Sequence, residues 1–411
     1  MLTLRGRAAL AAGASARWAS RVTGRGAGAM IGGLVAMTLD QSILRQLGQG
    51  RRTVVVTGTN GKSTTTRMAA AALATLGPVA SNSEGANMDA GLVAALAGTR
   101  DARLAALEVD EMHVPHVSDA VDPAVIVLLN LSRDQLDRVG EINHIERTLR
   151  TGLTRHPDAV IVANCDDVLM TSAAYDSPNV VWVAAGGSWA GDSVSCPRSG
   201  EIIVRDGAGW YSTGTEFKRP DPQWWFDDTH IYGPDGLVLP MALALPGAVN
   251  RGNATQAVAA AVILGADPAA AVAAVSGVDE VAGRYRTVQI GSHTARILLA
   301  KNPAGWQEAL SMVDQRGAGV VIAVNGQVPD GEDLSWLWDV RFEQFVGDTA
   351  RSRVVVAAGE RGTDLAVRLG YAGVEHSLVH DTVAAIESCP PGHVEVIANY
   401  TAFLQLNRRI S

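Results

Sequence analysis

The feature that most restricts the fold of this chain is a short glycine-containing loop between a β-branched run and a helical stretch. The run Val54–Val56 is followed by the loop Gly58-Thr59-Asn60-Gly61-Lys62-Ser63, and residues 63–76 have the composition of a helix. Glycines let backbone N–H groups turn towards phosphate oxygens, and the helix start adds a favourable partial charge. Lys62 is placed to reach the β- and γ-phosphates of a nucleotide, and Ser63 to offer its hydroxyl to Mg²⁺. The pattern predicts a strand, a phosphate-binding loop (P-loop) and a helix.

This loop is shorter than the common P-loop, whose first glycine would fall at Val56. A chance Gly-Lys-Ser turn is the alternative interpretation, but the flanking strand and helix and the threonines Thr64–Thr66 argue against it. We therefore expect ATP and Mg²⁺ as cofactors, bound by Gly58, Thr59, Asn60, Gly61, Lys62, Ser63 and Thr64.

Three further apolar runs end in polar residues, and two of these ends suit the same nucleotide site. The runs are 104–109, 124–129 and 159–163, and they alternate with helical stretches, as in a parallel sheet covered on both faces. Ligands of such sheets lie beyond the carboxyl ends of the strands. Glu108 is placed there to hold Mg²⁺, which prefers one or two carboxylates plus phosphate, and Asn130 is placed beside the nucleotide. A solvated acidic turn and an ordinary helix cap are the alternatives.

The composition restricts the classes of protein to which the chain can belong. The chain has 411 residues, of which 47% are hydrophobic, so we expect two or three domains with sizeable cores. A net charge of −8 argues against a nucleic-acid partner. The three cysteines (Cys165, Cys196 and Cys389) are far apart, which argues against a disulfide framework and favours the cytoplasm. No apolar run reaches the length of a transmembrane segment.

The pattern along the chain predicts the domain organisation. Residues 1–50 form an N-terminal helical segment without acids before Asp40, which either packs as a basic helix over about 5–22 or lies at the inner membrane face against anionic lipid. Residues 51–286 form the ATP-binding domain, with a Gly-, Ser-, Pro- and Trp-rich insertion at 186–240. Residues 287–411 form a second α/β domain, with strands expected at 320–324, 354–358 and 394–397.

The motifs together resemble the Mur ligase superfamily. Its shortened P-loop matches Gly58–Thr64, its magnesium glutamate matches Glu108, and its Asn-x-x-x-Asp-His-Leu-Asp segment is similar to Asn130–Asp137, with Gln135 where histidine is usual. The resemblance implies that Asn250 and Asn253 contact adenine and that Arg284 reaches the phosphates from between the domains. A solvated linker arginine is the alternative for Arg284. The implied fold is a Mur-ligase-like P-loop domain with a parallel sheet, plus a Rossmann-like C-terminal α/β domain.

Within the superfamily the C-terminal segments resemble the MurT family. These segments are Ala300–Trp306, Asp330–Asp339, Gly359–Arg361 and Asp364–Leu369. That resemblance implies ATP-dependent amidation of the D-glutamate α-carboxylate of the lipid II stem peptide, with ammonia supplied by a glutaminase subunit of the GatD type. Asp333 is the first candidate for a catalytic residue in this domain and Asp339 the second; loop acids that cap a helix are the alternative.

The chain differs from many members of the MurT family in its zinc-binding cysteines. Many MurT proteins carry a four-cysteine zinc ribbon in the insertion, whereas here Cys196 alone remains and the second knuckle, residues 211–217, has no cysteine. A structural zinc ion needs four ligands, so we expect no zinc site and a ribbon remnant held by tryptophan packing.

Two other functions remain open at this point. A folylpolyglutamate-synthase-like ligase would also lack the UDP-binding domain, although Lys301–Pro303 and Trp336–Asp339 argue against it. The second is an ATP-binding scaffold without turnover, against which intact Lys62, Ser63 and Glu108 argue.

Overall fold

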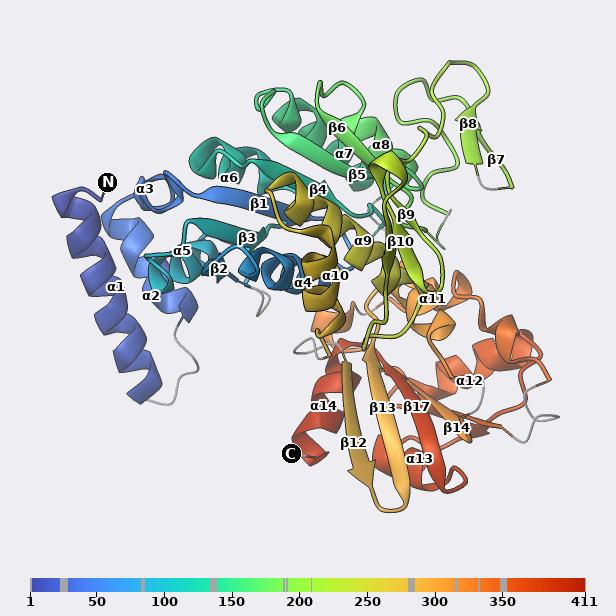
Figure 1. Cartoon of the computed structure of the whole chain (residues 1–411). Coiled ribbons are helices and arrows are strands. Elements are labelled where there is room, and N and C mark those ends of the chain that lie inside the picture. Colours follow the sequence, from blue (N-terminus) through green and yellow to red (C-terminus); the bar gives the residue numbers. More distant parts are fainter. Residues whose placement is uncertain are drawn as a thin grey trace. The chain divides into compact units, whose positions relative to one another are not determined.

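The computed structural model describes residues 2–22, 29–82, 86–133, 139–187, 189, 191–207, 209–279, 285–314, 317–331, 333–347 and 353–410 (Figure 1). The chain divides into two compact units: Met1–Ser132 with Gly140–Asp279, and Arg133–Val139 with Glu280–Ser411. Our sequence-based boundary lay at residue 286, and the N-terminal helices, which we treated as a separate segment, belong to the first unit.

The first unit contains a six-stranded sheet in which all neighbouring strands are parallel. The strand order is β2-β3-β1-β4-β5-β6. The first strand of the chain therefore lies inside the sheet, between β3 and β4. The bounds are β1 Arg52–Thr57, β2 Val79–Ser81, β3 Leu104–Glu108, β4 Val125–Leu128, β5 Val160–Asn164 and β6 Val180–Val183. The parallel sheet predicted from the apolar runs is confirmed.

Helices cover both faces of this sheet because successive strand residues point to opposite sides. Val55, Leu107 and Ile126 share one hydrophobic core with α3, α5, α6, α7 and α8. Helices α4, α9 and α10 pack against one another in a separate layer (Figure 1). The helix bounds are α3 Ile43–Gly48, α4 Lys62–Ala74, α5 Asp89–Gly98, α6 Val114–Val121, α7 Val139–Leu153, α8 Val168–Ala174, α9 Ala248–Ile263 and α10 Pro268–Ser276.

The N-terminal segment forms two helices that pack through glycines. Helix α1 (Leu4–Val22) meets α2 (Ala29–Leu39) where Gly13 lies against Gly32; a Cβ on Gly13 would be 2.5 Å from the Gly32 carbonyl oxygen. Gly33 lies even closer to Ala90 of α5, because a Cβ on Gly33 would be 2.0 Å from the Ala90 carbonyl oxygen. The basic helix predicted over residues 5–22 is confirmed, and it packs within the first unit. Among the described helices, none combines the length and hydropathy needed to cross a bilayer.

The insertion at residues 186–240 contains short strands. The strands are β7 Ile203–Asp206, β8 Gly209–Ser212, β9 Trp225–Phe226, β10 His230–Tyr232 and β11 Val238–Pro240. Cys196 shares a small core with Ile203, Trp210 and Phe217. The indole N–H of Trp210 donates to the Cys165 carbonyl oxygen at 2.9 Å. The tryptophan packing expected of the ribbon remnant is confirmed.

The second unit is also an α/β domain, built on a mixed sheet. The strand order is β12-β13-β17-β14-β15-β16; only the β12–β13 pair is antiparallel. Its core joins alternate residues of β14, β15 and β17 to Phe403 and Leu406. The element bounds are β12 Tyr285–Ile290, β13 His293–Leu299, α11 Pro303–Ser311, β14 Gly319–Ala323, η2 Val328–Asp330, η3 Ser335–Trp338, η4 Phe342–Phe345, β15 Val354–Ala358, α12 Gly362–Tyr371, β16 Ser377–Leu378, α13 Thr382–Glu387, β17 Gly392–Ala398 and α14 Tyr400–Ile410.

Candidate active site

The strand order brings three polar strand ends together. β3 and β4 are the two neighbours of β1, and the chain leaves all three strands at the same edge of the sheet. Glu108 ends β3, the P-loop follows β1, and Asn130 follows β4. In α/β sheets this edge, where the strand order reverses, is where ligands bind.

Two glycines of the loop have backbone conformations that other residues rarely adopt. Gly58 has φ +143° and Gly61 has φ +85°. A Cβ on Gly58 would lie 2.8 Å from the Cβ of Leu129, so the loop passes directly against the chain after β4. Gly61 is the N-cap of α4, and Lys62, Ser63 and Thr64 form the buried first turn of that helix. Their backbone N–H groups are therefore at a helix start, where anions bind favourably.

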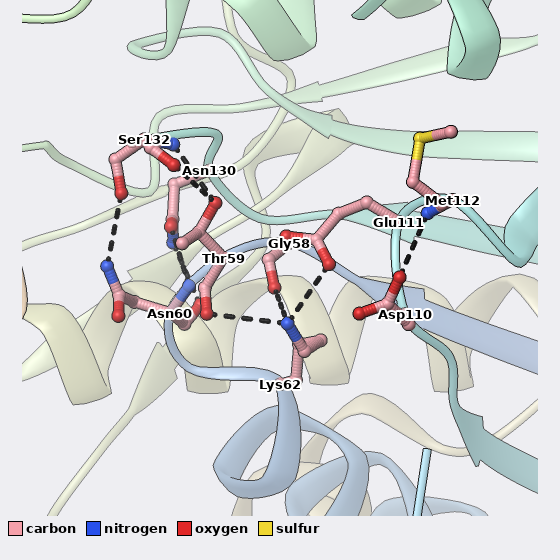
Figure 2. A network of polar contacts seen from close by, with 9 residues as sticks. All are labelled: Gly58, Thr59, Asn60, Lys62, Asp110, Glu111, Met112, Asn130 and Ser132. Atoms are coloured by element: carbon pink, nitrogen blue, oxygen red, sulfur yellow. Dashed lines mark hydrogen bonds and ion pairs between the residues drawn. The ribbon is translucent and has the colours of Figure 1, made fainter. Parts of the chain in front are cut away.

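The Lys62 ammonium is buried at the centre of this loop (Figure 2). It donates to the carbonyl oxygens of Gly58 at 2.5 Å and Thr59 at 3.4 Å. It also forms an ion pair with Glu111, whose Oε2 lies 3.2 Å away, and both side chains are about one-tenth exposed. Glu111 therefore offsets much of the cost of burying this cation. The ion pair between Glu111 and Lys62 was not predicted from the sequence.

Asn130 holds the loop in its shape rather than extending into open space (Figure 2). Its side chain accepts the backbone N–H of Asn60 and donates to the Asn60 carbonyl oxygen, each at 2.9 Å. The backbone oxygen of Asn130 accepts the N–H of Thr59, and the Ser132 N–H donates to the Thr59 hydroxyl. Both functional groups of the Asn130 amide are thus engaged by the loop backbone. A direct contact between Asn130 and nucleotide remains a prediction.

The geometry of Glu108 fits a magnesium site. Its side chain is 2% exposed, and its Oε2 is buried without a hydrogen-bond partner among the described residues. The Asn82 amide accepts the Glu108 backbone N–H and donates to the Glu108 carbonyl oxygen, both at 2.8 Å, which fixes this strand end. A buried carboxylate oxygen with no donor is costly unless a cation or a proton satisfies it. Glu108 is therefore a suitable ligand for Mg²⁺. Ser63 lies buried in the first turn of α4, and its contact with Mg²⁺ remains a prediction.

The structure also brings the start of α9 to the P-loop. Asn253 lies against Gly61, where an added Cβ would be 3.0 Å from its Oδ1, and its amide donates to Asn250 at 3.5 Å. Gln256, one turn further, donates to the carbonyl oxygen of Leu128 at the end of β4. The helix begins at Ala248, so Asn250 lies within its first turn. Both asparagines are buried.

Two predicted elements lie outside the described residues. Arg284 is one, so its contact with the phosphates remains a prediction. The other is the stretch 134–138, which includes Asp134, Gln135 and Asp137 of the family-like segment.

In the second unit Asp333 and Asp339 flank the short helix η3. Both oxygens of Asp333 accept from Ser335, the backbone N–H at 2.8 Å and the hydroxyl at 3.0 Å, and these bonds lower the pKa of the carboxyl group. Both bonds are local to the loop that leads into η3, whose N-cap is Leu334, and a catalytic role for Asp333 remains a prediction. Asp339 follows the other end of η3 and lines an open hollow of about 680 Å³ with Gln307, Arg341 and Arg368.

The tryptophan-rich segment around η3 is organised by Arg368. Its buried guanidinium donates to the carbonyl oxygens of Leu337 and Val340 and to Glu343. The guanidinium also lies over the rings of Trp338 and Phe342. One arginine thus fixes the helix that separates the two candidate aspartates.

A polar cluster at the carboxyl edge of this second sheet was not predicted. Asn325, after β14, exchanges two hydrogen bonds with Asn399, after β17, and accepts the backbone N–H of Glu360, after β15. Gln405 connects Asn325 to the Glu360 carboxylate. Part of the signal was present in the sequence, because Asn325, Glu360 and Asn399 each come one or two residues after a buried strand.

Each of the two units matches a known protein family. Residues 56–261 match the model of the Mur ligase middle domain, and residues 299–403 match that of the MurT ligase C-terminal domain. The MurT subunit of lipid II isoglutaminyl synthase (glutamine-hydrolyzing) from Streptococcus pneumoniae is 28% identical over 94% of this chain and 93% of its own. The same subunit of Staphylococcus aureus is 29% identical over 96% of each chain.

Solved structures show the same fold. A pseudomurein peptide ligase type C from Methanothermus fervidus aligns with a TM-score of 0.68 at 18% identity, covering 90% of this chain and 80% of that one. MurF from Acinetobacter baumannii aligns with a TM-score of 0.64 at 18% identity, covering 92% and 80%.

The fold and the shortened P-loop therefore define a Mur-type ligase. The match of the middle-domain model over residues 56–261 shows that the chain belongs to the Mur ligase family. With the C-terminal match and full-length similarity to MurT subunits, it belongs to the MurT branch of that family.

Proposed function

We propose that this chain uses ATP to amidate the α-carboxylate of D-glutamate in the stem peptide of lipid II, giving D-isoglutamine. The observation that carries the proposal is a shortened P-loop with Lys62 and Glu108 buried at one sheet edge, in a chain similar to MurT subunits over nearly its whole length. The reaction forms a C–N bond, which needs an activated carboxyl group. Phosphoryl transfer from ATP gives an acyl phosphate, and ammonia then displaces phosphate.

The residues of the first unit suit phosphoryl transfer, which depends on positioning and on offsetting charge. Backbone N–H groups of the loop and of the α4 start bind the phosphates. Lys62 is the only lysine of the loop and neutralises charge on the transferring group. Mg²⁺, held by Glu108 and Ser63, supplies further charge neutralisation when bound. Asn130, Asn250 and Asn253 shape the nucleotide site, and Arg284 assists at the phosphates.

The ammonia comes from a separate glutaminase. Glutamine hydrolysis by a cysteine requires an accessible thiolate. Burial, with Asp166 adjacent, raises the pKa of Cys165 to about 12, and burial raises that of Cys389 to about 11. Burial also acts to raise the pKa of Cys196, but hydrogen bonds from Ser199 and nearby N–H groups lower it. Cys196 lies in the ribbon core, without a histidine beside it in the described contacts.

An exposed aromatic face of the second unit suits this partner. Trp338 is 55% exposed and packs against Tyr371, which is 77% exposed, with ring centroids 5.3 Å apart. Val367, one turn before Tyr371, is also half-exposed. Aromatic residues surrounded by charges are typical of protein interfaces.

Trp338→Ser should weaken glutaminase binding in a titration. Trp225→Ser, at an exposed aromatic pair of the first unit, should not weaken it. Equal glutaminase affinities of the two variants would refute the proposal that this surface binds the glutaminase.

The N-terminal helices suit the surface of a membrane, where the substrate is anchored. Leu4, Trp18, Ile31 and Leu34 are 40–85% exposed, and residues 2–39 include no acidic residue. Basic residues with exposed apolar side chains favour anionic bilayers.

The chain should sediment with phosphatidylglycerol vesicles, and added salt should reduce the sedimented fraction. The double variant Trp18→Ser/Leu34→Ser should sediment less than wild type. Equal sedimentation with phosphatidylcholine vesicles would contradict the preference for anionic lipid, and no sedimentation with phosphatidylglycerol vesicles would contradict peripheral attachment.

The most direct test of the proposed function measures amidation of lipid II with ammonium and with glutamine as nitrogen sources. With ATP, Mg²⁺, lipid II and ammonium, the chain alone should form amidated lipid II; with glutamine it should do so only when the glutaminase is added. Product from tetrahydrofolate and glutamate instead would favour the folylpolyglutamate-type ligase. ATP binding without any product in the presence of the glutaminase would favour the scaffold.

A further inference from the structure

Three metal-ligating side chains outside the P-loop converge between the starts of two helices. Asp89 is the first residue of α5, His113 is the N-cap of α6, and His116 lies in the first turn of α6. One ligand atom from each residue lies within 4.8 Å of the other two. The Asp89 Oδ2 and His116 Nε2 are 2.7 Å apart, and the Asp89 Oδ1 and His113 Nδ1 are 3.5 Å apart.

Both histidines are within ion-pair distance of Asp89, but hydrogen bonding accounts for only half of this arrangement. The contact between Asp89 Oδ2 and His116 Nε2 is a normal hydrogen bond. Asp89 Oδ1 and His113 Nδ1, in contrast, are buried and have no hydrogen-bond partner among the described residues. Buried polar atoms are nearly always satisfied, so this pair indicates a missing ligand. A cation between the three side chains would bond to both orphaned atoms.

The ligand types identify the class of cation. Two imidazole nitrogens and one carboxylate oxygen suit Zn²⁺ and similar transition metals, whereas Mg²⁺ and Ca²⁺ prefer oxygen ligands. His113 and His116 are three residues apart at a helix start, so both rings can face one point. The three side chains are 22–51% exposed, which leaves a route for the ion and room for a fourth ligand.

We propose that Asp89, His113 and His116 bind a zinc-like transition-metal ion. Such an ion would join the start of α5 to the start of α6. The two chain segments also meet beside Glu108: Asn82 bonds the Glu108 backbone, and the Asp110 N–H donates to Asn87. The ion would therefore brace the chain on either side of the magnesium carboxylate. Our sequence-based expectation of no zinc considered the ribbon cysteines and did not weigh these histidines.

The histidine pair has a matched control in the same unit. His156 also lies 3.0 Å from a carboxylate, that of Asp119. Arg155 occupies both oxygens of Asp119, at 3.2 and 2.9 Å, so no cation can be shared there. His156→Gln therefore removes a carboxylate-paired histidine without touching the proposed site.

The experiment is a titration of the whole metal-free chain with Co²⁺ followed by visible absorption, and with Zn²⁺ followed by calorimetry, in the absence of ATP. Wild type and His156→Gln should bind one equivalent with the same affinity. Asp89→Asn and the double variant His113→Gln/His116→Gln should lose more than about tenfold in affinity. Cys196→Ser, which removes the thiol of lowered pKa, should leave the titration unchanged.

Thermal unfolding separates loss of the site from loss of the fold. Zn²⁺ should raise the melting temperature of wild type and His156→Gln and leave that of the double variant unchanged, because only a ligand of the native state stabilises it. No binding by wild type at micromolar Co²⁺ and Zn²⁺ would overturn the proposal. Unchanged affinity in Asp89→Asn and in the double variant would overturn it equally.

Discussion

Replacing Asn130 by alanine tests whether this residue shapes the P-loop or contacts the nucleotide. The substitution removes two hydrogen bonds of 2.9 Å, one to each backbone group of Asn60. Each hydrogen bond contributes about 1 kcal/mol, so the loop conformation that binds ATP should lose about 2 kcal/mol of stability. Since about 1.4 kcal/mol is a factor of ten, ATP affinity should fall by roughly 30-fold.

Amide hydrogen exchange provides an internal control at adjacent residues. The Asn60 N–H donates to the Asn130 side chain, whereas the Thr59 N–H donates to the Asn130 backbone oxygen, which alanine retains. In Asn130→Ala the Asn60 amide should exchange about tenfold faster or more, and the Thr59 amide should change much less. Asn130→Asp keeps the acceptor but loses the donor, so it should preserve Asn60 protection while weakening ATP binding.

One result would refute this reasoning. If Asn130→Ala loses ATP affinity while the Asn60 amide of the free protein exchanges at the wild-type rate, Asn130 acts by touching the nucleotide. The loop would then keep its shape without the side chain.

The remaining predictions concern the chemistry and its division between subunits. Lys62→Ala should lower ATP-dependent amidation by more than about a hundredfold, as for other transition-state donors, while the exposed Lys218→Ala should retain wild-type turnover; a Lys62→Ala enzyme of normal rate would exclude the site. If the Asp333 carboxylate assists the glutaminase, Asp333→Asn should lose glutamine-driven activity and retain ammonium-driven activity. Equal loss of both activities would place Asp333 in the synthetase step, and full activity with both nitrogen sources would leave Asp333 a helix cap. Serine at Cys165, Cys196 and Cys389 together should leave ammonium-driven product formation within about twofold if the triple variant folds by circular dichroism, because the proposed synthetase reaction uses none of these buried thiols; a larger loss in a folded variant would give a thiol a role.

The strands and the P-loop could be predicted because their signals are local. Residues 54–56, 104–109 and 124–129 are apolar runs that end in polar residues, and each became a buried strand. The glycine pattern at 58–63 has one common structural use. Local signals were also available for the β12–β13 hairpin, which we missed: Gly291 and Ser292 form a two-residue turn between alternating segments.

The roles of Glu111 and Asn130 could not be read from the sequence. Their partners, Lys62 and Asn60, are 49 and 70 residues away, and they meet only because β1 lies between β3 and β4. That order depends on tertiary packing rather than on any local pattern. Asp333 shows the opposite case, since an acid two residues before a serine is a local capping signal, which we had weighed as the alternative.

The central claim, that this chain activates the glutamate carboxylate by phosphorylation, can be tested by following oxygen. Lipid II labelled with ¹⁸O in the D-glutamate α-carboxylate is incubated with the chain, ATP, Mg²⁺ and ammonium, and the inorganic phosphate is analysed by mass spectrometry. If an acyl phosphate forms, one ¹⁸O atom should be transferred to phosphate for each amide formed, and none should be transferred with Lys62→Ala. Amidated lipid II accompanied by unlabelled phosphate, or ATP hydrolysis without amide, would contradict it.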